Sequence, residues 1–221
     1  MNSLVKICGL STPESVRTAQ CGGATHLGFI FFPKSPRNVS PQQAARLVQD
    51  VADIKTVAVT VNADNQFLNE ITEAMNPDIL QLHGAESSKR VAEIKQRYQR
   101  PVMKALAIRE ASDLDRIANY EGIADMFLLD AKPPEGSQLP GGNGVSFDWS
   151  LIAGLHSRLP ILLSGGIDQS NLNQALDYVQ QDQNDLIGID VSSGVESSPG
   201  VKDILKIEKF LAACHQRKNK D

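Results

Sequence analysis

The chain has 221 residues, of which 41% are hydrophobic and 22% are charged, as is ordinary for a globular protein. A net charge of -4 gives no basic field for nucleic acid or an anionic membrane surface, and no run of about 18 apolar residues is long enough to span a bilayer. Nucleic-acid and membrane partners are therefore excluded, and any phosphate bound here is expected to belong to a small molecule.

Three cysteines, Cys8, Cys21 and Cys214, cannot all pair, and their spacing fits neither a disulfide framework nor a CxxC metal site. The N-terminus lacks a basic segment followed by a long apolar run. Reduced thiols and this N-terminus predict a cytoplasmic protein. Cys21 and Cys214 fall in predicted helices, and we assign them no chemistry.

The first predicted element is a short buried strand, LVKICG, at residues 4–9. Because side chains alternate along a strand, Lys6 and Cys8 share one face while Val5 and Ile7 share the other. The face with Val5 and Ile7 is suited to packing, and the face with Lys6 and Cys8 carries reactive groups.

Strands and helices are predicted to alternate along the rest of the chain. Ser or Thr followed by Pro marks helix starts at Pro13 and Pro41, and Asn76-Pro77 marks a helix end. Further strands are predicted at 26–32, 56–62, 78–83, 101–106, 125–130, 160–163 and 186–191. Helices are predicted at about 11–22, 40–52, 64–75, 86–98, 111–120 and 168–180, with others starting near 148 and 201. The connection at 131–149 is the longest without predicted structure, and such loops are usually lids or binding loops.

Eight strands that alternate with eight helices indicate parallel strands joined by crossovers. We therefore predict an α/β fold, a single-domain (βα)8 TIM barrel over residues 1–221. A doubly wound open sheet is the alternative, and it gains little because no G-x-G-x-x-G follows the first strand.

Strand parity supports the barrel, because one face of most strands is almost purely apolar. The residues predicted to face the helices are Val5, Ile7, Val57, Val59, Leu80, Leu82, Phe127, Leu129, Ile187 and Ile189. The residues predicted to face the interior are Lys6, Cys8, Thr60, Asn62, Gln81, His83, Lys104, Asp130 and Asp190. Polar groups near the carboxyl ends of barrel strands lie where such barrels place their active sites.

Cys8 and Asp130 are the candidate base and acid, since both are predicted to point inward at the same end of the barrel. Proton transfer near neutral pH requires the pKa of the thiol to fall or that of the carboxyl to rise. Two other interpretations stay open: Cys8 as a small core hydrophobe, and Asp130 as a helix cap or loop anchor.

Two small-residue loops predict a phosphate site. Ser164-Gly165-Gly166-Ile167 and Ser192-Ser193-Gly194 follow neighbouring strands, where backbone N–H groups and helix N-termini can approach an anion closely. Gly141-Gly142-Asn143-Gly144 either closes over the same group or forms a flexible lid.

Three other polar residues have a functional and a structural interpretation. Arg37 could bind a carboxylate with its planar guanidinium, or it could be a solvated loop residue. Asp190 could accept hydrogen bonds from sugar hydroxyls, or it could pair with Lys6 or Lys104. For His83 a structural hydrogen bond is favoured over metal binding, because the four histidines are scattered.

Several stretches, in this order, together resemble the phosphoribosylanthranilate isomerase family: VKICGL, GFIFFPKSPRNVS, LQLHG, FLLDA, GGNGVSFDW, LSGGI and DVSSGVESSPGVKD. The resemblance runs through nearly the whole chain. It implies a barrel without a cofactor or metal, either a monomer or a homodimer, whose substrate is a small phosphosugar.

By this resemblance the reaction is the Amadori rearrangement of N-(5-phosphoribosyl)anthranilate, an aldose-to-ketose isomerisation in tryptophan biosynthesis. Asp130 would be the general acid on the ring oxygen, Cys8 the base at C2, and Arg37 the partner of the anthranilate carboxylate. The phosphate would lie against Gly165, Gly166, Ser193 and Gly194, with Gly142 closing nearby.

One departure from the family pattern is Asn143, which stands where threonine is usual, so that loop detail is expected to differ. Imidazole-carboxamide ribotide isomerases resemble the chain less, because they have an aspartate where Cys8 stands. A binding protein without catalysis is the alternative from another class, and it would not need both Cys8 and Asp130.

Overall fold

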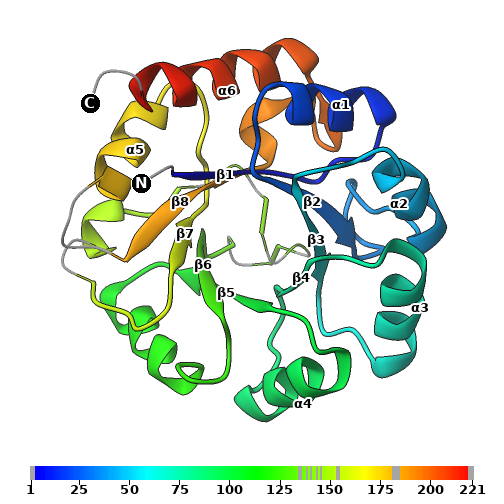
Figure 1. Cartoon of the computed structure of the whole chain (residues 1–221). Helices are drawn as coiled ribbons and strands as arrows, with labels where there is room; N and C mark the ends of the chain where they lie inside the picture. The colour runs from blue at the N-terminus through cyan, green and yellow to red at the C-terminus, as the bar shows by residue number, and fades with distance from the viewer. Residues whose placement is uncertain are drawn as a thin grey trace.

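Eight short apolar segments form parallel strands, and their closed order, β1 to β8, confirms the predicted barrel (Figure 1). The computed structural model describes residues 3–133, 136–137, 139, 141–142, 144, 146–152, 155–180 and 185–218. The last strand pairs with the first, with Lys6 opposite Asp190, and this pairing closes the barrel. The strands are β1 (Leu4–Cys8), β2 (His26–Phe31), β3 (Lys55–Thr60), β4 (Ile79–Leu82), β5 (Val102–Ile108), β6 (Met126–Ala131), β7 (Ile161–Leu163) and β8 (Leu186–Val191).

Helices surround the strands, and several begin where the sequence supplies a capping side chain. Thr12 accepts a hydrogen bond from the N–H of Ser15, and Ser40 accepts one from the N–H of Gln43. The α-helices are α1 (Pro13–Cys21), α2 (Pro41–Val48), α3 (Asn65–Met75), α4 (Ser88–Tyr98), α5 (Leu172–Gln180) and α6 (Ile204–Lys218). No helix in the described part of the chain is long and apolar enough to cross a membrane.

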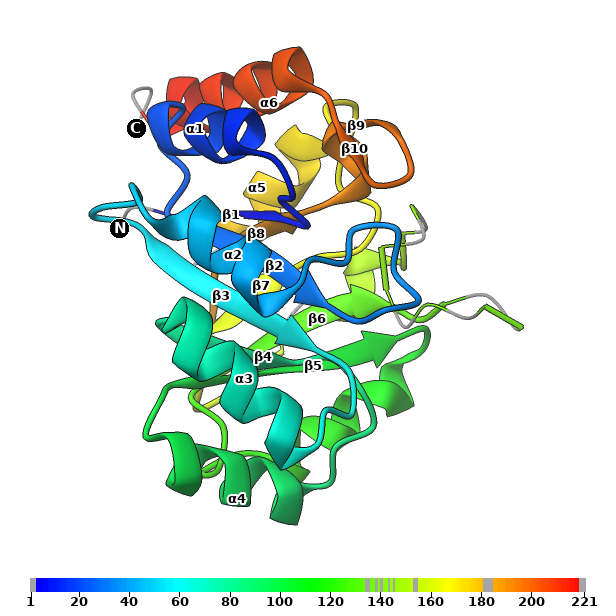
Figure 2. The same ribbon diagram turned by 90° about the vertical axis from the view of Figure 1, so that its right-hand side faces the viewer.

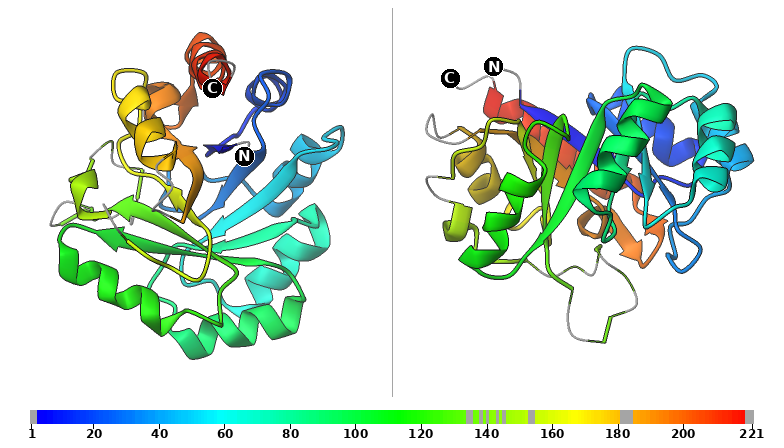
Figure 3. Two further views of the ribbon diagram at one scale, coloured as in Figure 1. Left: turned by 60° about the vertical axis from the view of Figure 1, so that its left-hand side comes forward. Right: turned by 90° about the horizontal axis from the view of Figure 1, so that it is seen from below.

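Connections that follow the strands gather at one end of the barrel. Figure 2 shows the loop after β2 and the segment after β8 on the same side as the end of β6. The described part of the connection after β6 projects from this end as well (Figure 3, right). Side chains on three strands far apart in sequence can therefore meet there.

The apolar core has two layers. An outer layer lies between strands and helices and includes Val5, Ile7, Leu80 and Phe127, as predicted. An inner layer fills the barrel with smaller or flexible side chains, among them Val57, Val59, Ile79, Met103, Ala105, Leu128 and Leu162. The interior of the barrel is thus a packed core.

The prediction for β3 was wrong, because Val57 and Val59 face the interior and not the helices. Thr60 shares the side of Ala58, which packs in the outer layer. The two threonines of this strand, Thr56 and Thr60, lie on the outer side with Ala58, so its more polar face is not the interior face. Ile187 also packs against the inner layer, beside an irregularity in the pairing of β7 with β8.

Besides Thr60, two other polar residues predicted inside the barrel lie outside it. Lys104 packs under the outer layer, where its Nζ lies 2.9 Å from Oε2 of Glu86 and 5.8 Å from the ring centroid of Tyr120. Asn62 accepts a hydrogen bond from the N–H of Ala85 in the loop after β4. Both lie near a strand end, where a loop carbonyl or N–H provides a partner that the alternation pattern does not reveal.

Three predicted helices differ from the structure. The segments after β5 and β6 form 3-10 helices, η1 (Ala111–Asn119) and η2 (Trp149–Ile152). A helix predicted from residue 201 begins later, because a one-turn η3 (Ser193–Val195) and a hairpin of β9 (Glu196–Ser198) and β10 (Val201–Lys202) come first. Ser-Pro-Gly at the hairpin tip is a turn sequence, and it interrupts any helix there.

Gly188 pairs with Leu4 where β8 closes the barrel on β1. A Cβ at Gly188 would collide with the carbonyl oxygen of Leu4. We expect Gly188→Ala to lower the free energy of unfolding by at least about 2 kcal/mol, because the ladder must open to admit the methyl group. Gly122→Ala is the control: its φ is +77°, but no atom lies within 4 Å of its Cβ position. Only the left-handed backbone cost of about 1 kcal/mol applies there. Equal losses in denaturant unfolding would contradict a steric role for Gly188.

Candidate active site

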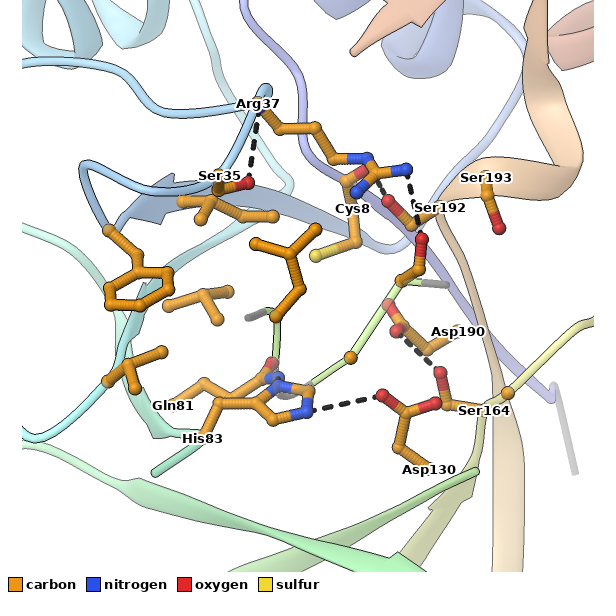
Figure 4. Close-up of a pocket in the computed structure, with 18 of the residues that line it drawn as sticks. Cys8, Ser35, Arg37, Gln81, His83, Asp130, Ser164, Asp190, Ser192 and Ser193 are labelled. Carbon is orange, nitrogen blue, oxygen red and sulfur yellow. Dashed lines mark hydrogen bonds and ion pairs between the residues drawn. The ribbon is translucent and has the colours of Figure 1, made fainter. Parts of the chain in front are cut away.

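A cavity opens at the carboxyl ends of the strands. Figure 4 shows Cys8, Arg37, His83 and Asp130 arranged around it. The predicted site residues that line it are Cys8, Arg37, Asp130, Gly142, Gly165, Gly166, Asp190 and Ser193. The fold therefore brings together groups that are separated by up to about 180 residues in sequence.

Cys8 ends β1 and is 4% exposed, with its carbonyl oxygen accepting a hydrogen bond from Oγ of Ser192. Burial raises the pKa of the Cys8 thiol, while the positive charges of Lys6 and Lys202 oppose this rise and the negative charge of Asp190 adds to it. The neighbouring cations therefore favour the thiolate form and oppose the effect of burial.

Asp130 near the end of β6 is 5% exposed and reaches the same cavity. Its Oδ2 lies 3.2 Å from Nε2 of His83, and its Oδ1 accepts a hydrogen bond from the N–H of Ala131. Side chains at Gly141 or Gly165 would press against this carboxylate, so the two glycines leave it room. One oxygen of the carboxyl group is thus held by the backbone, and the other by a histidine.

His83 has the structural hydrogen bond that the sequence predicts, and its partner is the candidate acid. Its Nδ1 lies 3.1 Å from Nε2 of Gln81, an atom that can only donate. Nδ1 is therefore the acceptor, and Nε2 carries the proton that faces Asp130. Oε1 of Gln81 is buried and has no hydrogen-bond partner among the described residues.

Arg37 is buried, not solvated, and the Glu196 carboxylate and the Gly142 carbonyl oxygen orient it. Its Nε lies 2.7 Å from Oε1 of Glu196, and one terminal nitrogen, Nη2, lies 2.8 Å from Oε2 of the same residue and 3.2 Å from the Gly142 carbonyl oxygen. Lys202 binds the same carboxylate at 2.8 Å. Nη1 has no partner in the described part of the chain, so one edge of the guanidinium remains for a ligand.

Glu196 and Lys202 are the functional neighbours that the sequence reasoning missed. Both belong to the hairpin after β8, and Glu196 is 6% exposed. Burial raises the pKa of Glu196, but contacts with Arg37 and Lys202 outweigh it and lower the pKa. The sequence did hold a signal for this pair, because Glu196 and Lys202 lie on either side of the turn sequence Ser-Pro-Gly. Cross-strand pairs of opposite charge are common in hairpins.

Asp190 pairs with Lys6 and not with Lys104, which the outer layer encloses. Its Oδ1 lies 2.6 Å from Nζ of Lys6, and its Oδ2 accepts a hydrogen bond from Oγ of Ser164 at 3.0 Å. Asp190 also lines the cavity. The pairing does not exclude a hydroxyl ligand, because a carboxylate has more acceptor sites than these two bonds use.

The two predicted phosphate loops lie side by side at the cavity. Gly165 and Gly166 have φ values of +88° and +62°, a backbone conformation that glycine adopts at little cost. Ser193 lines the cavity, whereas Gly194 is not among its described lining residues, and a Cβ there would collide with the Ile167 carbonyl oxygen. Gly194 thus lets the second loop pack against the first.

The connection after β6 contributes to the site, as the length of this loop suggested. Leu139, Gly141 and Gly142 line the cavity, and a Cβ at Gly142 would lie 2.8 Å from Nη1 of Arg37. Asn143, the departure noted in the sequence, lies outside the described residues. In the described part of the chain, no three His, Cys, Asp or Glu side chains cluster as metal ligands would.

Comparisons with known proteins agree with one another. The family model described as N-(5'phosphoribosyl)anthranilate (PRA) isomerase matches residues 5–213. Curated N-(5'-phosphoribosyl)anthranilate isomerases from Brucella canis and Brucella abortus are each 55% identical over 210 residues, 95% of this chain and 92% of theirs.

Solved structures show the same relationship. The phosphoribosyl anthranilate isomerase of Thermotoga maritima superposes with a TM-score of 0.84 at 33% identity, covering 97% of this chain and 99% of its own. A phosphoribosyl anthranilate isomerase in complex with reduced 1-(o-carboxyphenylamino)-1-deoxyribulose 5-phosphate gives 0.81 at 31% identity, with the same coverage. The chain therefore belongs to the N-(5'-phosphoribosyl)anthranilate isomerase family.

Proposed function

We propose that this protein is the isomerase of tryptophan biosynthesis that converts N-(5-phosphoribosyl)anthranilate into 1-(2-carboxyphenylamino)-1-deoxyribulose 5-phosphate. The observation that carries the proposal is the convergence of a buried thiol, a buried carboxyl group and an arginine edge on one cavity. The 31% identical neighbour bound to a reduced form of this product supports the same substrate class.

Asp130 acts as general acid in the first step. It donates its proton to the furanose ring oxygen, the bond from that oxygen to C1 breaks, and the anthranilate nitrogen forms a Schiff base with C1. His83 supports this role because its N–H bond to Oδ2 fixes the direction of the carboxyl group. The backbone bond from Ala131 restrains the other oxygen.

Cys8 acts as general base in the second step. Its thiolate takes the proton from C2, the electron pair moves toward the Schiff-base nitrogen, and the resulting enolamine tautomerises to the ketone. Cys8 and Asp130 lie on strands on different sides of the barrel, so each can reach a different part of one sugar. This separation suits a reaction that begins at the ring oxygen and ends at C2.

The remaining lining residues bind the two ends of the substrate. Arg37 offers its free Nη1 edge to the anthranilate carboxylate, beside Gly142. The phosphate lies in the loops of Gly165, Gly166, Ser193 and Gly194, where positive-φ glycines turn backbone N–H groups toward an anion. Asp190 accepts a hydrogen bond from a sugar hydroxyl.

Other features of the proposal concern the whole protein. It works as one barrel domain in the cytoplasm, without metal or cofactor, and as a monomer or homodimer. The thiols of Cys8 and Cys21 suit a reducing compartment. Among the compared structures, one is named as monomers generated from the dimeric enzyme of Thermotoga maritima.

Removal of the base or the acid tests the reaction. We expect Cys8→Ala and Asp130→Asn each to lower turnover of phosphoribosylanthranilate by at least about a hundredfold, the usual scale for a general acid or base. Both variants should still bind the reduced product analogue, because neither removes a phosphate or carboxylate contact. Steady-state assays with substrate generated in situ, in the presence of EDTA, measure the loss.

Cys21→Ala is the matched control for the thiol, because Cys21 is exposed on α1 and far from the cavity. Its turnover should equal that of the unmodified protein. Near-normal turnover in Cys8→Ala or Asp130→Asn would refute the role assigned to that residue. If the unmodified protein binds the reduced product analogue but shows no turnover, the isomerase itself is refuted and a binding protein is indicated.

Arg37→Lys tests the carboxylate site. Glu196 occupies two nitrogens of the Arg37 guanidinium, and the third is left for the substrate carboxylate. Lysine keeps the charge but has no such planar edge. We therefore expect the reduced product analogue to bind at least about tenfold more weakly. Binding of ribose 5-phosphate, which lacks the carboxylate, should not change. Calorimetric titration measures both ligands, with Arg17→Lys on the exposed face of α1 as the control. Equal weakening of both ligands would show that Arg37 supports the whole site and not the carboxylate.

A further inference from the structure

Lys6 is a charged residue in the barrel interior to which the proposed reaction gives no task. Its side chain is 0% exposed, and its Nζ lies 2.6 Å from Oδ1 of Asp190. Oγ of Ser164 holds the other oxygen of that carboxylate. Burying an ammonium ion is costly even when it is paired, so its place inside the barrel calls for an explanation.

Lys6 lies directly beside the thiol. Lys6 and Cys8 are two residues apart on β1 and point to the same side. Gly28 lies opposite Cys8 in the pairing of β1 with β2, and a Cβ there would be 2.9 Å from Sγ of Cys8 and 3.2 Å from Cε of Lys6. The missing side chain of Gly28 thus provides the space in which the thiol and the lysine meet.

Few other charges face this thiol. Asp190 approaches from β8 and Lys202 from β10, and both influence the ionisation of Cys8. His26 on β2 is neutral at physiological pH, because burial and then the charge of Lys6 lower its pKa to about 4. Burial lowers the pKa of Lys6, but Asp190 and then Cys8 outweigh it and raise that pKa to about 12, so Lys6 keeps its charge.

Lys104 shows what a purely structural buried lysine looks like in the same protein. It is also 0% exposed and paired with a carboxylate, that of Glu86, at 2.9 Å. Its Nζ also donates to the carbonyl oxygens of Leu82 and Gly84, which ties down the loop after β4. Lys6 donates to Asp190, and its other side-chain partner is the thiol of Cys8.

We propose that Lys6 is a positioning residue for the isomerase, a fixed buried cation that stabilises the thiolate of Cys8 and that Asp190 holds in place. The proposal deepens the proposed function, since it concerns the base of that reaction. At short range inside a barrel, a cation stabilises an anion far more than it does in water. The ion pair with Asp190 orients the cation without using all of its donors.

The test measures the ionisation of Cys8 directly, without substrate. Iodoacetamide alkylation of the Cys8 peptide is followed by mass spectrometry from pH 6.5 to 10, since only the thiolate reacts. We compare Asp190→Asn with the double variant Lys6→Met/Asp190→Asn, so that no carboxylate is left unpaired. We expect the double variant to alkylate at least about tenfold more slowly at pH 8, the effect of one unit of pKa, with the same rate at the high-pH plateau.

Asp190→Asn by itself gives a second measurement that does not depend on the double variant. It removes the negative charge that raises the pKa of Cys8 while Lys6 remains, so its alkylation profile should move to lower pH than that of the unmodified protein. The matched control is Lys104→Met/Glu86→Gln, which neutralises the other buried pair. Its profile for Cys8 should not move.

Two results would overturn the proposal. One is the same alkylation rate at pH 8 for Asp190→Asn and for Lys6→Met/Asp190→Asn. The other is a shift in the Lys104→Met/Glu86→Gln control as large as that in Lys6→Met/Asp190→Asn, which would mean that any buried charge pair matters equally. Neither result depends on turnover, so failure of the proposed reaction would be seen separately, in the assay of the Cys8→Ala and Asp130→Asn variants.

Discussion

Closing eight strands into a barrel creates an interior that water cannot fill, so a charged group inside needs a partner within the protein. This constraint explains the arrangement of the site. Lys6 is inside only because Asp190 lies opposite it in the pairing of β1 with β8, and Asp190 is satisfied in turn by Ser164. Chemistry is confined to the open end of the barrel, where a ligand can complete the remaining hydrogen bonds.

The fold and much of the site could be predicted from sequence, because both depend on local patterns. Strand and helix periods repeat along the chain, and small residues at the ends of β7 and β8 mark the loops that meet at the cavity. Cys8 and Asp130 occupy corresponding places at strand ends, so parity alone predicted that both point inward. Such features require only a few neighbouring residues to specify them.

Other features depend on contacts between distant segments, and no local pattern reveals them. Val57 and Val59 face the interior although the threonines of their strand lie on the opposite face. Glu196 orients Arg37 across 159 residues of sequence. His83 hydrogen-bonds to Asp130 from another strand. Predictions fail here because pairing partners are chosen by the closed topology, which the alternation of residues does not encode.

One guanidinium joins three loops of the site. Arg37 comes from the loop after β2, Glu196 from the hairpin after β8, and Gly142 from the connection after β6. A substitution in any one of these loops therefore changes the hydrogen bonds that hold the other two in place. Variation in substrate preference within this family should show epistasis across these loops, with accepted changes arriving in compensating sets and not one at a time.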